Sequence, residues 1–168
     1  MLPSLIGTTL HDLEAVAKQG GMPRFVAKQL ADWLYAKRVS SFEEMANISK
    51  KNKAWLADNY QIGRSKPVKA SKSQDGTVKY LFDVGCGNRV ESVMIPDKER
   101  ATLCVSSQCG CKMNCYFCAT GKLGFKKNLT AAEIMNQILS MPIRQNKTGG
   151  NESGELTNIV FMGMGEPL

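Results

Sequence analysis

The stretch ATLCVSSQCGCKMNCYFCATG, Ala101 to Gly121, joins an apolar run to a dense group of cysteines. Its first seven residues, Ala101 to Ser107, predict a short buried strand. Cys111, Cys115 and Cys118 follow with the spacing C-x3-C-x2-C. Because the strand runs directly into the cysteine loop, the loop is expected at the carboxyl end of a strand, where parallel sheets and barrels hold their ligands.

The sequence after the loop predicts a helix and a second strand. Thr130 and Glu133 form a capping box, and the apolar face of the helix that follows is Ile134, Met135, Ile138 and Leu139. The polar, glycine-rich residues 144–155 predict a surface loop. LTNIVFMGMGEPL, residues 156–168, then predicts a fully buried strand that ends in glycines.

Strand, loop, helix, loop and strand together make a βαβ unit, the building block of parallel α/β folds. One such unit cannot bury both faces of a parallel sheet. We therefore expect residues 99–168 to be the start of a larger barrel or sheet, truncated at Leu168. Such a chain is expected to expose apolar surface and to self-associate or unfold easily.

Upstream of this unit the pattern predicts two further parts. Residues 1–62 predict a module of four short amphipathic helices, with apolar faces that include Leu10, Leu13, Val16, Val26, Leu30, Met45, Ile48 and Leu56. Residues 63–98 alternate with period two around the turn signal Asp75-Gly76, which predicts a small antiparallel sheet. The predicted fold class is α/β, with domains at 1–62, 63–98 and 99–168.

Composition narrows the classes of function. The net charge of +7 and the pI of about 9.2 fit an RNA-binding protein, although a merely solvated basic surface fits them too. Apolar runs of about 18 residues are absent, which argues against a transmembrane helix, and the first residues lack the pattern of a signal peptide. The six cysteines therefore predict a protein of the reducing cytoplasm, where thiols serve metals or catalysis.

The cysteine loop predicts a metal centre. Three thiolates hold a cubane iron–sulfur cluster when the fourth iron is left for another ligand. A zinc site with Cys109 or Cys104 as the fourth ligand is the alternative, and unligated reduced cysteines are a third. The single histidine, His11, is distant in sequence. Two aromatic residues between the last two ligands are expected to shield the centre, Tyr116 and Phe117.

The loop and the strands around it resemble the radical S-adenosylmethionine (SAM) superfamily. The resemblance implies that Cys111, Cys115 and Cys118 hold a [4Fe–4S] cluster and that SAM binds its open iron. It also implies that GMGEPL, Gly163 to Leu168, binds the SAM amino group through Gly165 and Glu166. A strand-terminating turn is the ordinary structural alternative for that segment.

The chain resembles most closely the RlmN/Cfr group of radical SAM methyltransferases, which act on adenine in RNA. ATLCVSSQCGCKMNCYFCATGKLGFKKNLT and NIVFMGMGEPL carry this resemblance, and it covers nearly the whole chain but only about the first half of a family protein. It implies methylation of adenine C2 in 23S ribosomal RNA and transfer RNA, with C8 methylation as the runner-up. Lysines around the loop are expected to meet RNA phosphates: Lys112, Lys122, Lys126 and Lys127.

The resemblance also assigns catalytic roles. It implies a methyl-carrying cysteine beyond Leu168, so residues 1–168 alone are not expected to turn over. Cys104 matches the cysteine that releases the product by forming a disulfide, and Glu91 matches the proton acceptor. The ordinary alternatives are a small buried residue for Cys104 and an exposed glutamate for Glu91. Cys109 and Cys86 receive no role.

The resemblance implies an electron donor such as a flavodoxin-type protein. From a different class, a zinc-stabilised RNA-binding module without catalysis is the competing hypothesis.

Overall fold

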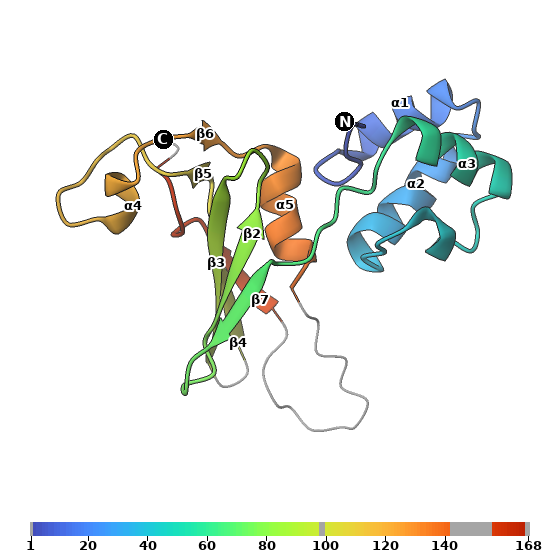
Figure 1. The fold of residues 1–168 in the computed structure, drawn as a ribbon. Coiled ribbons are helices and arrows are strands. Elements are labelled where there is room, and N and C mark those ends of the chain that lie inside the picture. Colours follow the sequence, from blue (N-terminus) through green and yellow to red (C-terminus); the bar gives the residue numbers. More distant parts are fainter. Residues whose placement is uncertain (1, 98–99, 142–155, 167–168) are drawn as a thin grey trace. The chain divides into compact units, whose positions relative to one another are not determined.

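A computed structural model describes residues 2–97, 100–141 and 156–166 (Figure 1). The chain forms two compact units. The helical unit contains residues Met1–Ser65 and Thr130–Leu139, and the sheet unit contains Lys66–Leu129 and Ser140–Leu168. In the described ranges, no helix is both long and apolar enough to cross a membrane.

The helical unit contains helices α1 (Leu10–Gln19), α2 (Phe25–Ala31), α3 (Lys50–Asn59) and α5 (Ala131–Leu139). A π-helical turn, Asp32–Ala36, extends α2. The predicted third helix of the amino-terminal module is only a 3₁₀ turn, Phe42–Glu44, although its Ser41–Glu44 capping box forms. Pro23 precedes α2, and Thr9 and Ser49 cap α1 and α3. Local capping signals therefore locate most helix starts correctly.

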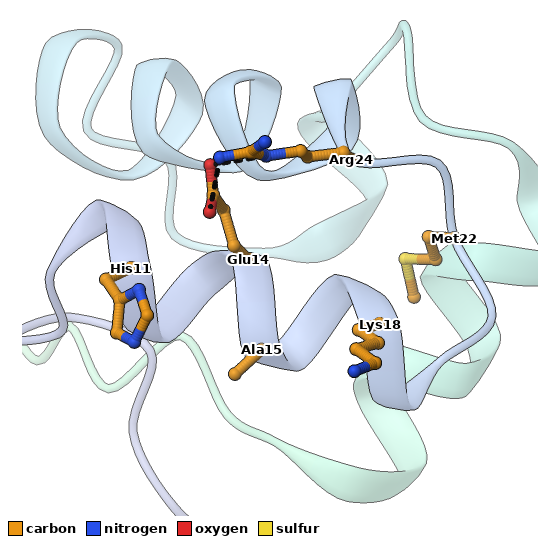
Figure 2. A pocket seen from close by; sticks show the side chains of 6 residues that line it. All are labelled: His11, Glu14, Ala15, Lys18, Met22 and Arg24. Atoms are coloured by element: carbon orange, nitrogen blue, oxygen red, sulfur yellow. Dashed lines mark hydrogen bonds and ion pairs between the residues drawn. The ribbon is translucent and has the colours of Figure 1, made fainter.

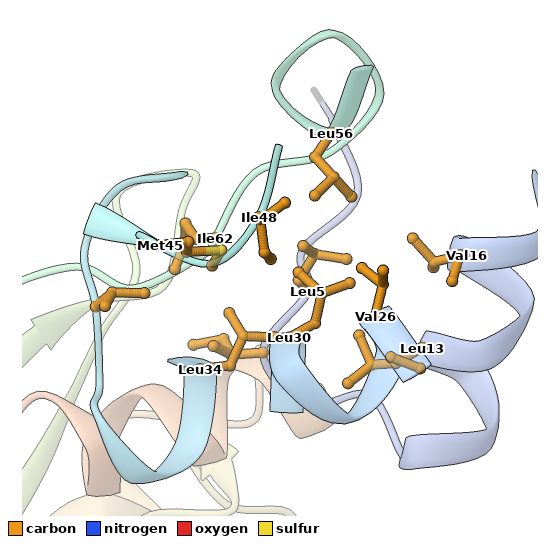
Figure 3. Packing of buried hydrophobic residues seen from close by; sticks show 14 of the residues in the cluster. Leu5, Leu13, Val16, Val26, Leu30, Leu34, Met45, Ile48, Leu56 and Ile62 are labelled. Atoms are coloured by element: carbon orange, nitrogen blue, oxygen red, sulfur yellow. The ribbon is translucent and has the colours of Figure 1, made fainter. Parts of the chain in front are cut away.

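One apolar cluster forms the core of this unit (Figure 3). Buried side chains from all its segments point toward one another, among them Leu5, Leu13, Val26, Leu30, Leu34, Met45, Ile48 and Leu56. Leu10, expected on the inner face of α1, is instead 43% exposed because it lies in the first turn, at the end of the buried stripe.

Helix α5 buries Leu139 and packs Met135 against the core as predicted, but it also buries two polar residues that were not predicted. The Thr130–Glu133 capping box forms, but Asn136, Gln137 and Leu139 are the buried residues of the helix. Asn136 is stabilised by Ser65, whose N–H donates to Oδ1 (2.8 Å) and whose Oγ accepts from Nδ2 (2.8 Å). A buried amide with satisfied hydrogen bonds is as acceptable in a core as an apolar side chain.

The sheet unit contains one five-stranded mixed sheet in the order β1-β2-β3-β4-β7. Its strands are Lys69–Lys72, Val78–Asp83, Arg89–Asp97, Arg100–Cys104 and Leu156–Val160. The first three pairings are antiparallel, and β4 pairs with β7 in parallel. The predicted antiparallel sheet and the predicted parallel pair are therefore parts of a single sheet, joined where β3 pairs with β4.

The strand β7 is not fully buried, contrary to the prediction. Its pattern is mostly exposed, and Ile159, Phe161 and Met162 are 44%, 59% and 79% exposed. In the described part of the chain, β7 pairs only with β4 and lies at the edge of the sheet. The expected exposure of apolar surface is confirmed here.

Candidate cofactor and catalytic site

The loops after β4 and β7 lie side by side at the carboxyl ends of these two parallel strands. Cys104 and Val160, the last residues of the two parallel strands, are partners in the register. The N–H of Val105 donates to the carbonyl of Val160 (2.9 Å), and the N–H of Gly163 donates to the carbonyl of Val105 (3.1 Å). The cysteine loop and the glycine-rich segment therefore begin together, as ligand-binding loops of parallel sheets do.

The glycine-rich segment, defined here as Gly163–Glu166, is tied closely to the start of the cysteine loop. The N–H groups of Ser107 and Gln108 both donate to the carbonyl of Met164, at 3.0 and 3.1 Å. A Cβ on Gly163 would lie 2.7 Å from Ser106 Oγ, and one on Gly165 would lie 2.5 Å from Gln108 Cβ. Gly165 also has φ +106°, so this close approach requires glycine.

Glu166 is fixed through its backbone N–H, whereas its side chain is exposed to solvent. Its N–H donates to Gln108 Oε1 at 3.1 Å, and the residue is exposed. A carboxylate presented in this way can accept hydrogen bonds from an ammonium group.

The three candidate ligands lie on one surface loop. Cys111 and Cys118 are half-buried and Cys115 is exposed. The N–H of Cys118 donates to the carbonyl of Cys115 (3.0 Å), just before the short helix α4 (Ala119–Lys122). Among the described residues, no three histidine, cysteine or acidic side chains come together closely enough to hold a metal ion. The loop therefore carries the three candidate ligands, but it does not bring their sulfur atoms together.

The donor chemistry nevertheless fits an iron–sulfur cluster. The backbone of Gly121, and after it that of Thr120, lowers the pKa of the Cys118 thiol below its usual range. The thiolate is the form that binds metals. Three thiols within eight residues and no histidine on the loop match the ligand set of such a cluster better than that of a mixed zinc site.

The aromatic pair in the loop does not shield the thiols in this structure. Tyr116 is 94% exposed and Phe117 is 90% exposed. The expectation of a shielding role is therefore wrong for this conformation, because the two rings project from a surface loop.

Glu91 and Cys104 share one face of the sheet. Cys104 on β4 is the cross-strand partner of Val93 on β3, and Glu91 lies two residues from Val93 on the same strand. Cross-strand partners and alternate residues point to the same side. Cys104 is half-buried, and Glu91 Oε1 lies 3.0 Å from Lys79 Nζ.

The two cysteines without a predicted role, Cys109 and Cys86, lie in different surroundings. Cys109, on β5 (Gln108–Cys109), is buried, and its Sγ lies 3.6 Å from the carbonyl oxygen of Arg89. Cys86 is exposed in a turn, with φ +54°. All six cysteines are free thiols in this structure.

The basic side chains around the loop are only partly available to a polyanion. Lys127, on β6 (Lys127–Asn128), uses Nζ to donate to the carbonyl of Val84 (2.9 Å). Lys112 places Nζ 4.6 Å from the centre of the Phe125 ring. Among the described residues, the side chains of Lys122 and Lys126 form no hydrogen bond or ion pair, which leaves them as the candidates for phosphate contacts.

A cavity of about 510 Å³ lies elsewhere, in the helical unit (Figure 2). His11, Ala15, Lys18 and Met22 line it, together with the ion pair Glu14–Arg24 at 3.0 Å. It contains none of the site residues predicted from the sequence.

Sequence reasoning missed two buried polar residues, Ser106 and Gln108, which are 0% and 4% exposed. Both bind the glycine-rich segment through hydrogen bonds. The sequence signal that could have revealed them is the presence of two polar residues where the apolar strand passes into the cysteine loop.

Comparisons with known proteins agree on one family. A family model described as the ribosomal RNA large subunit methyltransferase N-terminal domain matches residues 4–62. The probable dual-specificity RNA methyltransferase RlmN of Bacteroides thetaiotaomicron is 56% identical over 164 residues, covering 98% of this chain and 45% of that protein. The dual-specificity RNA methyltransferase RlmN of Saccharophagus degradans is 46% identical, with 98% and 42% covered.

A solved structure supports the same conclusion. The crystal structure of a radical SAM methyltransferase from Sphaerobacter thermophilus matches with a TM-score of 0.86 and 37% identity, covering 98% of this chain and 48% of that one. The chain therefore spans a little under half the length of the relatives that it matches.

Proposed function

The chain belongs to the RlmN family of RNA methyltransferases, of which it spans the amino-terminal part, and from this premise we propose that it carries the cluster and SAM site of a radical SAM enzyme that methylates adenine in RNA. The observation that carries the proposal is the meeting of the cysteine loop with the glycine-rich segment at the ends of β4 and β7. In parallel α/β folds, ligands bind at the carboxyl ends of the strands.

In this proposal Cys111, Cys115 and Cys118 hold a [4Fe–4S] cluster, which when bound supplies the electron that cleaves SAM. The carbonyl of Gly165 and the carboxylate of Glu166 bind the SAM ammonium group. Two features support these roles: the backbone N–H of Glu166 is already engaged, and its side chain is exposed.

Glu91 and Cys104 act on the RNA in the proposed reaction. Glu91 accepts the proton that the adenine ring loses, and Cys104 forms the disulfide that releases the product. Their common face on neighbouring strands supports a shared role. The methyl-carrying cysteine is assigned outside residues 1–168, so the reaction requires the full family length.

The proposed substrates are 23S ribosomal RNA and transfer RNA, methylated at adenine C2. The relatives' description as dual-specificity RNA methyltransferases supports RNA as the substrate, and the choice of C2 rests on the family resemblance. We also propose a cytoplasmic protein that receives its electron from a flavodoxin-type donor.

The decisive assay uses a protein of full family length that contains this sequence, incubated anaerobically with SAM, a reductant and 23S ribosomal RNA or transfer RNA. We expect 2-methyladenine, and we expect the separate substitutions Cys115→Ala, Glu91→Gln and Cys104→Ala to abolish product release. Cys86→Ala, an exposed thiol in a turn, is the matched control. Methyl on C8 would overturn the regiochemistry, and no methylated adenine would overturn the function.

A further inference from the structure

We propose that Ser106 and Gln108 are positioning residues, which hold the glycine-rich segment in the conformation that binds the SAM ammonium group. The inference rests on the proposed function, because it takes Gly165 and Glu166 as the groups that contact SAM. It adds two residues that touch neither the cofactor nor the reacting atoms.

Ser106 connects the glycine-rich segment to the strand that carries Glu91. Its Oγ accepts from the N–H of Met164 at 2.8 Å and donates to the carbonyl of Glu91 at 2.6 Å. The side chain is completely buried. Water therefore cannot replace these bonds when the hydroxyl is removed, and the buried N–H and carbonyl lose a partner.

Gln108 makes a second bridge from the same part of the chain. Its Oε1 accepts from the N–H of Glu166 (3.1 Å), and its Nε2 donates to Asn128 Oδ1 on β6 (2.9 Å). The side chain is 4% exposed. Because β6 pairs with β5, which leads into the cysteine loop, the amide links that loop to the residue proposed to bind SAM.

The two bridges fix the backbone on both sides of Gly165. Met164 is held at its N–H by Ser106, and its carbonyl accepts from the N–H groups of Ser107 and Gln108. Glu166 is held at its N–H by Gln108. The Gly165 carbonyl and the Glu166 carboxylate are thus presented by a segment whose neighbouring backbone groups are already satisfied, which lowers the ordering cost of binding.

Ser107 provides a matched control. It is the adjacent serine, it is also buried at 9% exposure, and among the described residues its hydroxyl forms no hydrogen bond. Ser107→Ala therefore removes the same atom from the same region without removing either bridge. Gln108→Leu removes both bonds of the second bridge, the acceptor for the N–H of Glu166 and the donor to Asn128 Oδ1.

The test measures SAM affinity and amide exchange in a protein of full family length that contains this sequence, after anaerobic reconstitution of the cluster. Affinity is followed by the change that SAM causes in the electron paramagnetic resonance spectrum of the reduced cluster. We expect Ser106→Ala and Gln108→Leu to weaken SAM binding about fivefold to tenfold, the loss of roughly one hydrogen bond. Exchange should become faster at the N–H of Met164 in the first variant and of Glu166 in the second.

Ser107→Ala should stay within about twofold of the wild type, with iron content and the circular dichroism spectrum unchanged in all three variants. Wild-type affinity in Ser106→Ala and Gln108→Leu, with SAM bound normally by the unsubstituted protein, would overturn the positioning role alone. An unsubstituted, reconstituted protein that binds no SAM would overturn the proposed SAM site itself.

Discussion

Glu91 on β3 and Lys79 on β2 form an ion pair at 3.0 Å, and both side chains are about half exposed. The sequence allowed two roles for Glu91, a catalytic proton acceptor or an ordinary surface glutamate. The register adds that Cys104 lies on the same face. By contrast, Ser106 and Gln108 bind residues 58 positions away, so no local pattern predicts their partners.

The Glu91–Lys79 pair is expected to contribute little to folding, because exposed ion pairs are screened by solvent. Lys79→Gln should lower the free energy of unfolding by less than about 1 kcal/mol in a urea titration. Lys69→Gln, at an exposed lysine on β1 without an ion pair in the described ranges, is the control. A loss above about 2 kcal/mol for Lys79→Gln would show that the pair is structural.

Gly165→Ala should disturb the glycine-rich segment more than Gly21→Ala disturbs its turn. Both glycines have positive φ, +106° for Gly165 and +63° for Gly21. Only Gly165 has a close neighbour, because a Cβ added to it would lie 2.5 Å from the Cβ of Gln108. Strained backbone of this kind costs about 1–3 kcal/mol. Amide exchange at Ser107 and Gln108 should therefore become at least tenfold faster in Gly165→Ala. Unchanged exchange would contradict the tight packing.

At the scale of elements, the capping signals and periodicity predicted most helices and strands, because these signals act within a few residues. The exceptions depend on the rest of the fold. Phe42–Glu44 forms only one 3₁₀ turn, and α5 buries Asn136 through Ser65. The parallel pairing of β4 with β7 was predicted, whereas the exposure of β7 follows from its place at the sheet edge.

Removing the cap of α1 should destabilise the helical unit. Thr9 Oγ1 accepts from the N–H of Asp12 (3.2 Å), and the Asp12 carboxylate accepts from the N–H of Thr9 (2.8 Å). Thr9→Ala should cost about 1 kcal/mol of unfolding free energy. Ser40→Ala, an exposed serine whose hydroxyl has no partner among the described residues, should cost less than about 0.5 kcal/mol. Equal losses in the two variants would contradict the role of the cap.

The Ser41–Glu44 box predicts a dependence on pH. The N–H of Ser40 donates to Glu44 Oε1 (2.8 Å), and this bond, with that from Ser41, holds the pKa of the carboxyl below its usual 4.5. A lowered native pKa stabilises the fold above the unfolded pKa, and the contribution is lost as the pH falls through the native value.

The advantage of wild type over Glu44→Gln should therefore be full at pH 7 and should shrink as the pH falls below the usual glutamate pKa of 4.5. Urea titrations of both proteins across this range measure it. A difference that grew toward acid pH would have the wrong sign for this account.

At the scale of the whole molecule, the sequence indicated a helical module, antiparallel strands and a βαβ unit, and the structure joins the strands into one mixed sheet. The pairing of β3 with β4 could not be predicted, because it depends on non-local hydrogen bonds between two strands that fit either separate sheets or one. Spacing alone left an iron–sulfur cluster and a zinc site open, and the family resemblance assigned Cys111, Cys115 and Cys118 as ligands. Among the described residues, their convergence on a metal is not a feature of this conformation.

Iron and acid-labile sulfide analysis of residues 1–168, purified and reconstituted without oxygen, tests the central claim most directly. The account predicts about four iron and four sulfide per chain, with a brown absorbance that Cys115→Ala removes and Cys86→Ala keeps. One zinc per chain with no sulfide would contradict it and would favour a zinc-stabilised module without radical chemistry.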